Sequence, residues 1–457
     1  MTAQIESINP ANGNTVATYT EMKVKETKAI INEVNQEWLS WRHTDFDHRA
    51  KLMHNAASVL RRHKEKYAHL MALEMGKVLK EGVSEIEKCA WVCDYYADNA
   101  ARFLKSEEVD TEATHSFVSF QPIGVVLAVM PWNFPFWQVL RFAAPALMAG
   151  NAGVLKHASN VTGCALAIES MFVEAGFPKN IFRTLIVSSA KVEEVIKNEH
   201  VKAVTLTGST PAGKSVASIA GGALKKSVLE LGGSDPYIIL KDADLEQAAS
   251  KCATSRLINN GQSCISAKRF IVVKEVKEAF EKLMIKYMST KVMGDPFESG
   301  TDVGPMARVD LRDELHHQVE KSIEMGATCI LGGHFEKDKG AYYSPTILTD
   351  VKWGSPAYHE ELFGPVASII EASNEKEAIE IANSSFFGLG AAVFTQDKAR
   401  GERIAEKEID AGCCFVNDFV RSDPRLPFGG VKGSGYGREL SAFGIREFVN
   451  IKSVYVK

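Results

Sequence analysis

Apolar residues in the first hundred positions recur at intervals of three and four, which is the spacing of one face of an amphipathic helix. This pattern predicts helices over residues 26–41, 49–75 and 84–103. Ser84 is followed three residues later by Glu87, and this capping-box spacing places the start of the third helix near Ser84. The chain is therefore expected to open with a helical segment.

From residue 124 onward, short apolar runs alternate with segments of helical periodicity. The predicted strands cover residues 124–130, 153–156, 182–187 and 203–207. The predicted helices cover residues 137–149, 162–175 and 192–198, and a further helix opens near Pro211. This alternation predicts a doubly wound parallel α/β sheet, and such sheets bind nucleotides at the carboxyl ends of their strands.

A second alternating region follows the first, with a helix over residues 244–259, a strand over 270–273 and a helix over 276–289. It predicts a second α/β domain. Two segments outside both regions have strand-like patterns. Residues 111–120 alternate and predict a hairpin, and residues 448–456 predict a C-terminal strand.

Length and charge limit the classes of protein that the chain can represent. With 457 residues it is too long for one core of typical size, so two or three domains are expected. No basic tract indicates a nucleic acid or a membrane surface. The longest apolar run, residues 125–130, is far shorter than the ~18 residues of a spanning helix. Residues 1–6 lack the parts of a signal peptide, so a cytoplasmic enzyme is expected.

The cysteines and histidines do not form a metal-binding pattern. Eight cysteines in a chain of this length do not predict a disulfide framework. Cys89 and Cys93 are one helical turn apart without further ligands nearby, so core packing is expected for them. His316 and His317 are adjacent, and adjacent helical residues do not converge on one metal. No metal site is predicted.

Cys264 ends the polar stretch Asn-Asn-Gly-Gln-Ser-Cys of residues 259–264. A cysteine is nucleophilic only as the thiolate, which needs a polar or electropositive setting. Glu230 lies earlier in the chain, and a carboxylate near the same centre can act as a general base. Taken alone, a buried structural cysteine and a surface glutamate are the simpler interpretation, because free cysteine is among the most buried residue types.

Five segments resemble, in order, the signatures of the aldehyde dehydrogenase superfamily. They are Pro-Trp-Asn-Phe-Pro at residues 131–135, Glu-Leu-Gly-Gly at 230–233, Gly-Gln-Ser-Cys at 261–264, Glu-Glu-Leu-Phe-Gly-Pro at 360–365 and Pro-Phe-Gly-Gly-Val-Lys at 427–432. The resemblance runs from residue 8 to about residue 448. It implies an aldehyde dehydrogenase-like α/β fold with two doubly wound domains and a small β oligomerisation element.

The same resemblance implies where these parts lie. Residues 1–108 and 124–229 form the dinucleotide-binding domain, and residues 230–435 form the catalytic domain with the nucleophilic cysteine. Residues 109–123 and 436–457 form the oligomerisation element. A homodimer or homotetramer is therefore expected.

The resemblance implies oxidation of an aldehyde to a carboxylate through a cysteine thiohemiacetal and thioester. Cys264 is the nucleophile, and Glu230 activates the water that hydrolyses the thioester. The side-chain amide of Asn133 and the backbone N–H of Cys264 stabilise the oxyanion. A catalytically silent member of the fold is an alternative, although such a protein has no need of these three residues.

Residues 208–215 fit the P-loop pattern, which indicates a nucleoside triphosphatase as another alternative. About three predicted strands precede this segment, whereas a P-loop normally follows the first strand of its domain. The segment also resembles the family's Thr-Gly-Ser-Thr turn, which meets a dinucleotide pyrophosphate at a helix start. The resemblance assigns cofactor contacts to Trp132, Lys156, Ser159, Gly208, Ser209, Leu231, Glu361 and Phe363.

Ser159 occupies the position where the family carries a glutamate that holds the adenine ribose. A carboxylate repels a 2′-phosphate, whereas Ser159 leaves room for one and Lys156 adds a favourable charge. NADP⁺ is therefore expected to be preferred, with NAD⁺ as the other candidate cofactor.

Arg141 lies eight residues after the asparagine of the first signature, where members acting on succinic semialdehyde carry a carboxylate-binding arginine. Ser422 and Arg425 are candidates for a second anchor, and Trp137 is a candidate substrate contact. A second arginine of some such enzymes is Ile258 here, which leaves part of the assignment open. The whole pattern is most similar to bacterial NAD(P)-dependent succinate-semialdehyde dehydrogenases, with another small aliphatic or acidic aldehyde as the alternative substrate.

Overall fold

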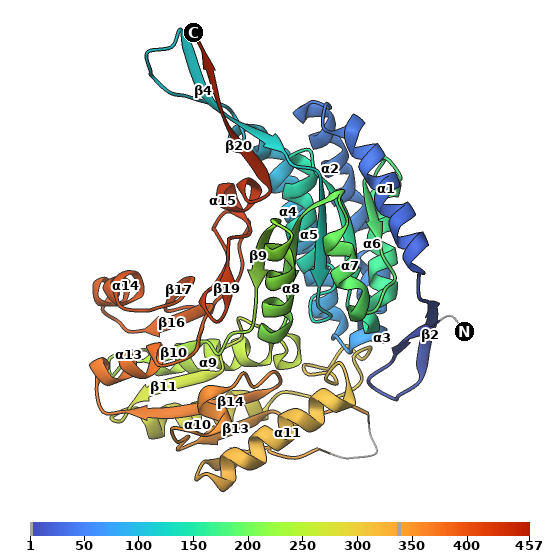
Figure 1. The fold of residues 1–457 in the computed structure, drawn as a ribbon. Helices are drawn as coiled ribbons and strands as arrows, with labels where there is room; N and C mark the ends of the chain where they lie inside the picture. The colour runs from blue at the N-terminus through green and yellow to red at the C-terminus, as the bar shows by residue number, and fades with distance from the viewer. Residues whose placement is uncertain (1–2, 336–339) are drawn as a thin grey trace.

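The computed structural model describes residues 3–335 and 340–457, which form two large sheets with flanking helices (Figure 1). Residues 1 and 2, which belong to the opening segment considered for a signal peptide, lie outside the described residues. An antiparallel pair of β1 (Gln4–Ile8) and β2 (Thr15–Thr20) precedes the helices. Within the described residues, none of the helices combines the length and apolar character that crossing a bilayer requires.

Four helices follow this pair: α1 (Val24–Trp41), α2 (Phe46–Arg62), α3 (Lys64–Met75) and α4 (Leu79–Phe103). The prediction of one helix over residues 49–75 is wrong. At His63 the backbone leaves the helical region, with φ −105° and ψ 14°, and divides the segment in two. Both α2 and α3 pack against α4, so the apolar spacing continues across the break and conceals it in the sequence.

The predicted start of the third helix near Ser84 is also wrong, because α4 already begins at Leu79. Inside the helix, the Ser84 hydroxyl donates to the carbonyl of Lys80 at 2.9 Å. A serine can satisfy its hydroxyl in this way within a helix. The spacing to Glu87 therefore has no capping role. Cys89 and Cys93 lie on this helix and are fully buried in the apolar core, as predicted.

The first sheet contains six strands in the order β19-β9-β8-β5-β6-β7. Five of them are parallel and β19 is antiparallel to β9. The strands are β5 (Val125–Met130), β6 (Ala152–His157), β7 (Phe182–Thr184), β8 (Val201–Thr207), β9 (Lys226–Glu230) and β19 (Gly435–Tyr436). The associated helices are α5 (Trp137–Met148), η1 (Ser159–Val161), α6 (Thr162–Glu174), η2 (Ser189–Lys191), α7 (Val192–Lys197) and α8 (Thr210–Gly222).

The second sheet contains seven strands in the order β12-β13-β14-β11-β10-β16-β17, all parallel except β12. The strands are β10 (Pro236–Ile239), β11 (Arg269–Val273), β12 (Thr328–Leu331), β13 (Thr346–Thr349), β14 (Val366–Ala372), β16 (Gly390–Phe394) and β17 (Cys413–Val416). Its helices are α9 (Leu245–Leu257), η3 (Ile258–Gly261), α10 (Lys277–Ser289), α11 (Val309–Glu324), α12 (Pro356–His359), α13 (Glu375–Asn383) and α14 (Lys398–Lys407). Two parallel α/β sheets confirm the predicted fold class.

Smaller elements complete the fold. The short pair β15 (Phe387–Gly388) and β18 (Val431–Lys432) is antiparallel, and α15 (Ser441–Arg446) precedes the last strand. A third sheet joins β3 (Glu107–Glu108), β4 (His115–Pro122) and β20 (Val449–Val456), and projects from the body at the C-terminus (Figure 1). The predicted domain boundaries stay a prediction, and β19 shows that the segment near residue 435 returns to the first sheet.

The strand order of the first sheet places a crevice between β5 and β8. From β5 the chain moves outward to β6 and β7, and it then returns to the other side for β8 and β9. Open α/β sheets bind ligands at such a switch point, at the carboxyl ends of the strands. A ligand site is therefore expected at the residues that follow β5 and β8.

Candidate active site

A strained turn presents Cys264. After α9 ends, Asn259, Asn260 and Gly261 all have positive φ, at 55°, 57° and 76°. Asparagine and glycine tolerate this left-handed backbone better than other residues. Gly261 is also required by space, because a Cβ there would lie 2.3 Å from the backbone of Gly364. The polar stretch noticed in the sequence is thus a backbone requirement of the turn.

Other elements hold this turn from several sides. The Asn259 N–H donates to the Glu81 carboxylate at 2.9 Å, and the Asn260 side chain donates to the carbonyls of Gly76 and Pro305, both at 3.0 Å. These contacts come from the start of α4 and from loops remote in sequence. They offset the strain, because such conformations persist only where the surroundings over-determine them.

Cys264 lies in the wall between two cavities. The first cavity, of about 290 Å³, opens at the carboxyl ends of β5 and β8, and we call it the sheet-edge cavity. The second, of about 330 Å³, is bordered by α4 and α5, and we call it the α4–α5 cavity. Among the residues that the structure describes, only Cys264 and Gln138 line both cavities. A reacting group on Cys264 is therefore accessible from either side.

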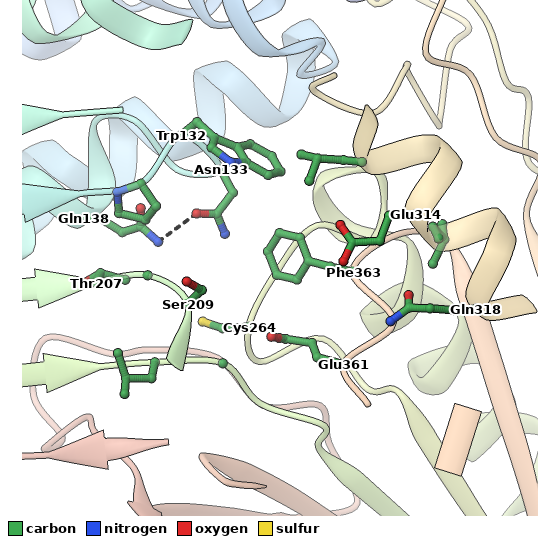
Figure 2. Close-up of a pocket in the computed structure, with 16 residues that line it drawn as sticks. Trp132, Asn133, Gln138, Thr207, Ser209, Cys264, Glu314, Gln318, Glu361 and Phe363 are labelled. Atoms are coloured by element: carbon green, nitrogen blue, oxygen red, sulfur yellow. Dashed lines mark hydrogen bonds between the residues drawn. The ribbon is translucent and has the colours of Figure 1, made fainter. Parts of the chain in front are cut away.

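The sheet-edge cavity gathers residues from the first sheet and from helix and loop segments that flank the second sheet (Figure 2). One wall follows the strand ends, and the facing wall comes from α11 and the segment before β14. Its lining residues are Pro131, Trp132, Asn133, Gln138, Thr207, Gly208, Ser209, Leu231, Gly232, Cys264, Leu311, Glu314, Leu315, Gln318, Glu361 and Phe363. Six of the eight predicted cofactor residues are in this set. Four α11 residues at helical spacing were missed, because nothing local indicates which partner an amphipathic face meets.

The thiol of Cys264 is half-buried, and loss of solvent raises its pKa to about 12. The charges of Lys268 and Arg141 act in the opposite direction and favour the thiolate. Lys268 also donates to the carbonyl oxygens of Ser263 and Cys264 at 2.9 and 2.8 Å, which fixes the backbone under the sulfur. In this state the thiol is protonated at neutral pH.

Asn133 is held with its amide beside the cysteine turn. Its Nδ2 donates to the carbonyl of Gln262 at 3.0 Å, and its Oδ1 accepts from Gln138 Nε2 at 3.1 Å (Figure 2). An amide nitrogen carries two hydrogens, so one remains to donate to a ligand. The backbone carbonyl of Asn133 accepts from Lys77 at 3.0 Å and from Asn259 at 2.7 Å.

A buried ion pair supports Asn133 and the start of α5. Lys77 and Glu85 form a salt bridge in which the two side chains are 0% and 2% exposed. Glu85 also accepts from the backbone N–H groups of Phe136 and Trp137, both at 2.9 Å, at the N-terminus of α5. The sequence did not identify this pair, because neither residue lies in a signature segment.

Glu230 ends β9 with its carboxylate buried away from both cavities. It is 2% exposed, and neither oxygen has a hydrogen-bond partner among the described residues. Burial raises its pKa well above the ordinary value, and the nearby Glu439 carboxylate raises it further, against the opposing charge of Arg141. Glycine at position 429 makes room, since a Cβ there would lie 2.7 Å from a Glu230 oxygen.

Glu361 and Phe363 shape the wall opposite the strand ends. The Glu361 carboxylate pairs with Lys268 at 3.1 Å and accepts from the Gly233 N–H at 3.1 Å. A Cβ on Gly232 would meet Glu361 at 2.4 Å, so the Gly-Gly of the second signature permits this approach. The Phe363 ring lies edge-on to Trp132, with ring centroids 5.7 Å apart.

Lys156 and Ser159 lie beyond the sheet-edge cavity, at the end of β6 and in η1. Lys156 is buried and Ser159 is exposed. The P-loop alternative has no support here, because Lys214 is exposed and its ammonium contacts the Phe386 ring at 5.8 Å. It does not line the cavity at the switch point.

The predicted substrate residues separate into two groups. Trp137, Arg141 and Ser422 line the α4–α5 cavity. Arg141 is only 3% exposed there and forms an ion pair with Glu439. Arg425 does not line the cavity, and its guanidinium pairs with Asp423 at 2.7 Å.

Comparison with known proteins agrees with this geometry. Residues 1–454 match the aldehyde dehydrogenase family. This match covers nearly the whole chain, including both sheets and the cysteine between the two cavities. The chain therefore belongs to the aldehyde dehydrogenase family. The recognition made from the five signatures is therefore confirmed, and the nucleoside triphosphatase alternative is not supported.

Individual relatives are similar along the whole chain. A probable succinate-semialdehyde dehydrogenase [NADP(+)] of Synechocystis is 49% identical over 452 residues, which cover 99% of each chain. Succinate-semialdehyde dehydrogenase [NADP(+)] 1 of Mycobacterium tuberculosis is 48% identical over 455 residues, also 99% of each. The crystal structure of succinic semialdehyde dehydrogenase from Streptococcus pyogenes with NADP⁺ has a TM-score of 0.96 and 38% identity, and covers 99% of both chains.

Proposed function

We propose that this protein oxidises succinic semialdehyde to succinate, with NADP⁺ in the sheet-edge cavity and the aldehyde in the α4–α5 cavity. The observation that carries the proposal is the position of Cys264 in the wall that the two cavities share. The relatives named above, which are similar along their whole length, support the choice of substrate and cofactor.

The residues around the sheet-edge cavity suit a dinucleotide. Ser209 is the N-cap of α8, where unpaired backbone N–H groups favour a phosphate. Gly208 and Gly232 let a ligand approach the backbone closely. Trp132, Leu231, Glu361 and Phe363 supply the remaining walls. When bound, NADP⁺ supplies the hydride acceptor for the oxidation.

In the proposed cycle, the Cys264 sulfur attacks the aldehyde carbon from between the cavities. The remaining N–H of the Asn133 amide and the Cys264 backbone N–H stabilise the oxyanion, and losing one such donor typically costs ~10²–10³ in rate. Oxidation leaves an acyl group on Cys264, which water releases. Glu230 serves as the base for this water after its side chain rotates out of the buried position beside Glu439.

The cofactor preference is proposed from Ser159 and Lys156. An exposed hydroxyl leaves room for a 2′-phosphate where a carboxylate would repel it, and the nearby lysine adds charge. We expect the ratio of kcat/KM values to favour NADP⁺ over NAD⁺ by tenfold or more, and to reverse in the variant Ser159→Glu. A clear preference of the native protein for NAD⁺ would contradict this part of the proposal.

One experiment tests the substrate. Formation of NADPH is followed at saturating NADP⁺ with succinic semialdehyde and with butanal, which has the same four-carbon chain without the carboxylate. A kcat/KM at least tenfold higher for the acid supports the proposal, and equal values overturn it. No turnover of any aldehyde would favour the catalytically silent alternative.

A further inference from the structure

The α4–α5 cavity contains five charged side chains, and four of them already have partners. Glu85 pairs with Lys77, and Arg141 pairs with Glu439. The remaining two paired groups are Glu81, which accepts from the Asn259 N–H, and Arg421, which pairs with Asp418 at 2.6 Å. The fifth charged group is Lys88 of α4.

Among the cations that line this cavity, Lys88 is the one without a carboxylate partner, since Arg141 and Arg421 each form an ion pair. Its ammonium donates to the Ser422 hydroxyl at 2.8 Å and lies over the Trp137 ring at 4.2 Å. Within the described residues, no carboxylate lies within salt-bridge distance of it. The side chain is half-buried, so its charge is only partly hydrated. The Lys88 ammonium is thus positioned to bind an anion that enters the cavity.

Arg141 is less suited to receive a substrate carboxylate. Its guanidinium is paired with Glu439, donates to the Thr207 hydroxyl at 3.3 Å and lies over the Phe428 ring at 4.8 Å. The net charge of the Arg141–Glu439 pair is close to zero. If Arg141 turned to a substrate instead, the buried Glu439 carboxylate would lose its compensating charge. The arginine that the sequence analysis favoured thus has a structural partner already.

We propose that Lys88, with Ser422, binds the distal carboxylate of the aldehyde and sets the preference for acid-bearing substrates. This inference rests on the proposed function. Because the ammonium donates to the Ser422 oxygen, the hydroxyl hydrogen of Ser422 remains to donate to the same carboxylate. The Trp137 face holds the ammonium in place. Lys88 and Cys264 line one cavity of about 330 Å³, a volume suited to a small ligand.

The test compares native protein with the variants Lys88→Met and Lys88→Arg, at saturating NADP⁺. For Lys88→Met we expect kcat/KM for succinic semialdehyde to fall about 10- to 100-fold, mainly through KM, as for loss of a hydrogen bond to a charged group. The loss with butanal is expected to be at least tenfold smaller. Lys88→Arg keeps the charge and is expected to restore most of the preference for the acid.

Lys80→Met is the matched control, since Lys80 lies on the same helix, pairs with Asp302 at 2.8 Å and does not line the cavity. It should leave both substrates unaffected. An equal loss of both substrates in Lys88→Met would indicate a structural role and overturn the inference. An unchanged preference for the acid would overturn it as well, while the proposed function would stand. If the native protein shows no such preference, the proposed function itself fails.

Discussion

The backbone that leads to Cys264 is strained, and the Cys264 thiol is protonated at neutral pH. Three left-handed residues lead into it, and burial raises its thiol pKa to about 12 while Lys268 and Arg141 oppose this shift. Reactivity at neutral pH therefore depends on what occupies the two cavities. A bound cofactor or aldehyde changes the surroundings of the sulfur, and the cations beside it favour the thiolate.

Replacing the proposed nucleophile should remove catalysis without unfolding the protein. In Cys264→Ala we expect NADPH formation to fall by at least 10⁴-fold, because no other described cysteine lines either cavity. Absorbance assays measure the activity, and fluorescence titration measures NADPH binding, which should persist. Substantial remaining turnover would show that Cys264 is not the nucleophile.

Replacing the proposed base should separate the two halves of the cycle. In Glu230→Gln the acyl group should still form, since Glu230 lies away from both cavities, but its hydrolysis should slow by about 10²–10⁴-fold. Stopped-flow absorbance should then show a burst of NADPH followed by a slow steady state. A variant without a burst would place Glu230 in the first half of the reaction.

The preference for the acid substrate should weaken at alkaline pH. Burial and the charge of Arg141 lower the pKa of Lys88 to about 8, while Cys89, Glu85 and Asp423 act in the opposite direction. Lys88 is charged below this pH and loses its charge above it. We therefore expect the ratio of kcat/KM for succinic semialdehyde to that for butanal to fall above pH 8, approaching tenfold per pH unit. The ratio cancels the titration of Cys264, and a flat ratio would contradict the expectation.

At the scale of elements, the N-terminus of α5 is tied to α4 by the buried Lys77–Glu85 pair. Glu85 accepts from two N–H groups of α5, and Lys77 holds the carbonyl of Asn133. The pair therefore connects the stability of the helices to the position of Asn133, the proposed oxyanion donor. A buried pair of this kind is weak evidence for net stabilisation, but breaking it leaves an uncompensated charge.

The variant Lys77→Met should lose about 3–5 kcal/mol of unfolding free energy, because Glu85 would stay buried without its cation. Chemical denaturation measures this change. The control is Lys282→Met, which breaks the exposed pair with Glu278 and should leave the unfolding free energy almost unchanged, because solvent screens the two charges. Equal effects in the two variants would contradict the role assigned to burial.

At the scale of the whole molecule, the projecting sheet of β3, β4 and β20 leaves apolar side chains in solvent. Ile451 and Tyr455 on β20 are 62% and 57% exposed. An exposed apolar edge strand is a site of association between chains. The homodimer or homotetramer stays a prediction, and this sheet is the surface that we expect to form its interface.

The double variant Ile451→Lys and Tyr455→Lys should therefore shift the protein toward monomer, as measured by sedimentation velocity. Leu224 offers a control, because it is 96% exposed on a different part of the molecule, and Leu224→Lys should not change the assembly. A double variant that sediments like the native protein would exclude this sheet as the interface.

The sequence by itself determined the features that depend on residues close together in the chain. Apolar runs predicted four of the six strands of the first sheet, β5 to β8, because strand and helix periods are properties of short segments. They missed β9 and the short β19. The signature segments contain glycines that close neighbours require: the Glu361 carboxylate lies against Gly232, and the backbone of Gly364 lies against Gly261. Class and fold followed from the order of these segments.

Tertiary structure alone decided which distant groups share a cavity. Lys88 meets Ser422 across 334 positions of sequence, and Arg141 meets Glu439 from a different segment again. No periodicity or spacing encodes such pairs, because they depend on how separate elements pack. The break at His63 was hidden for the same reason, since packing against α4 preserved the apolar pattern on both sides. The candidate nucleophile Cys264 was thus recognisable in the chain, whereas the position of Lys88, which we propose to face the substrate, became visible only in the folded molecule.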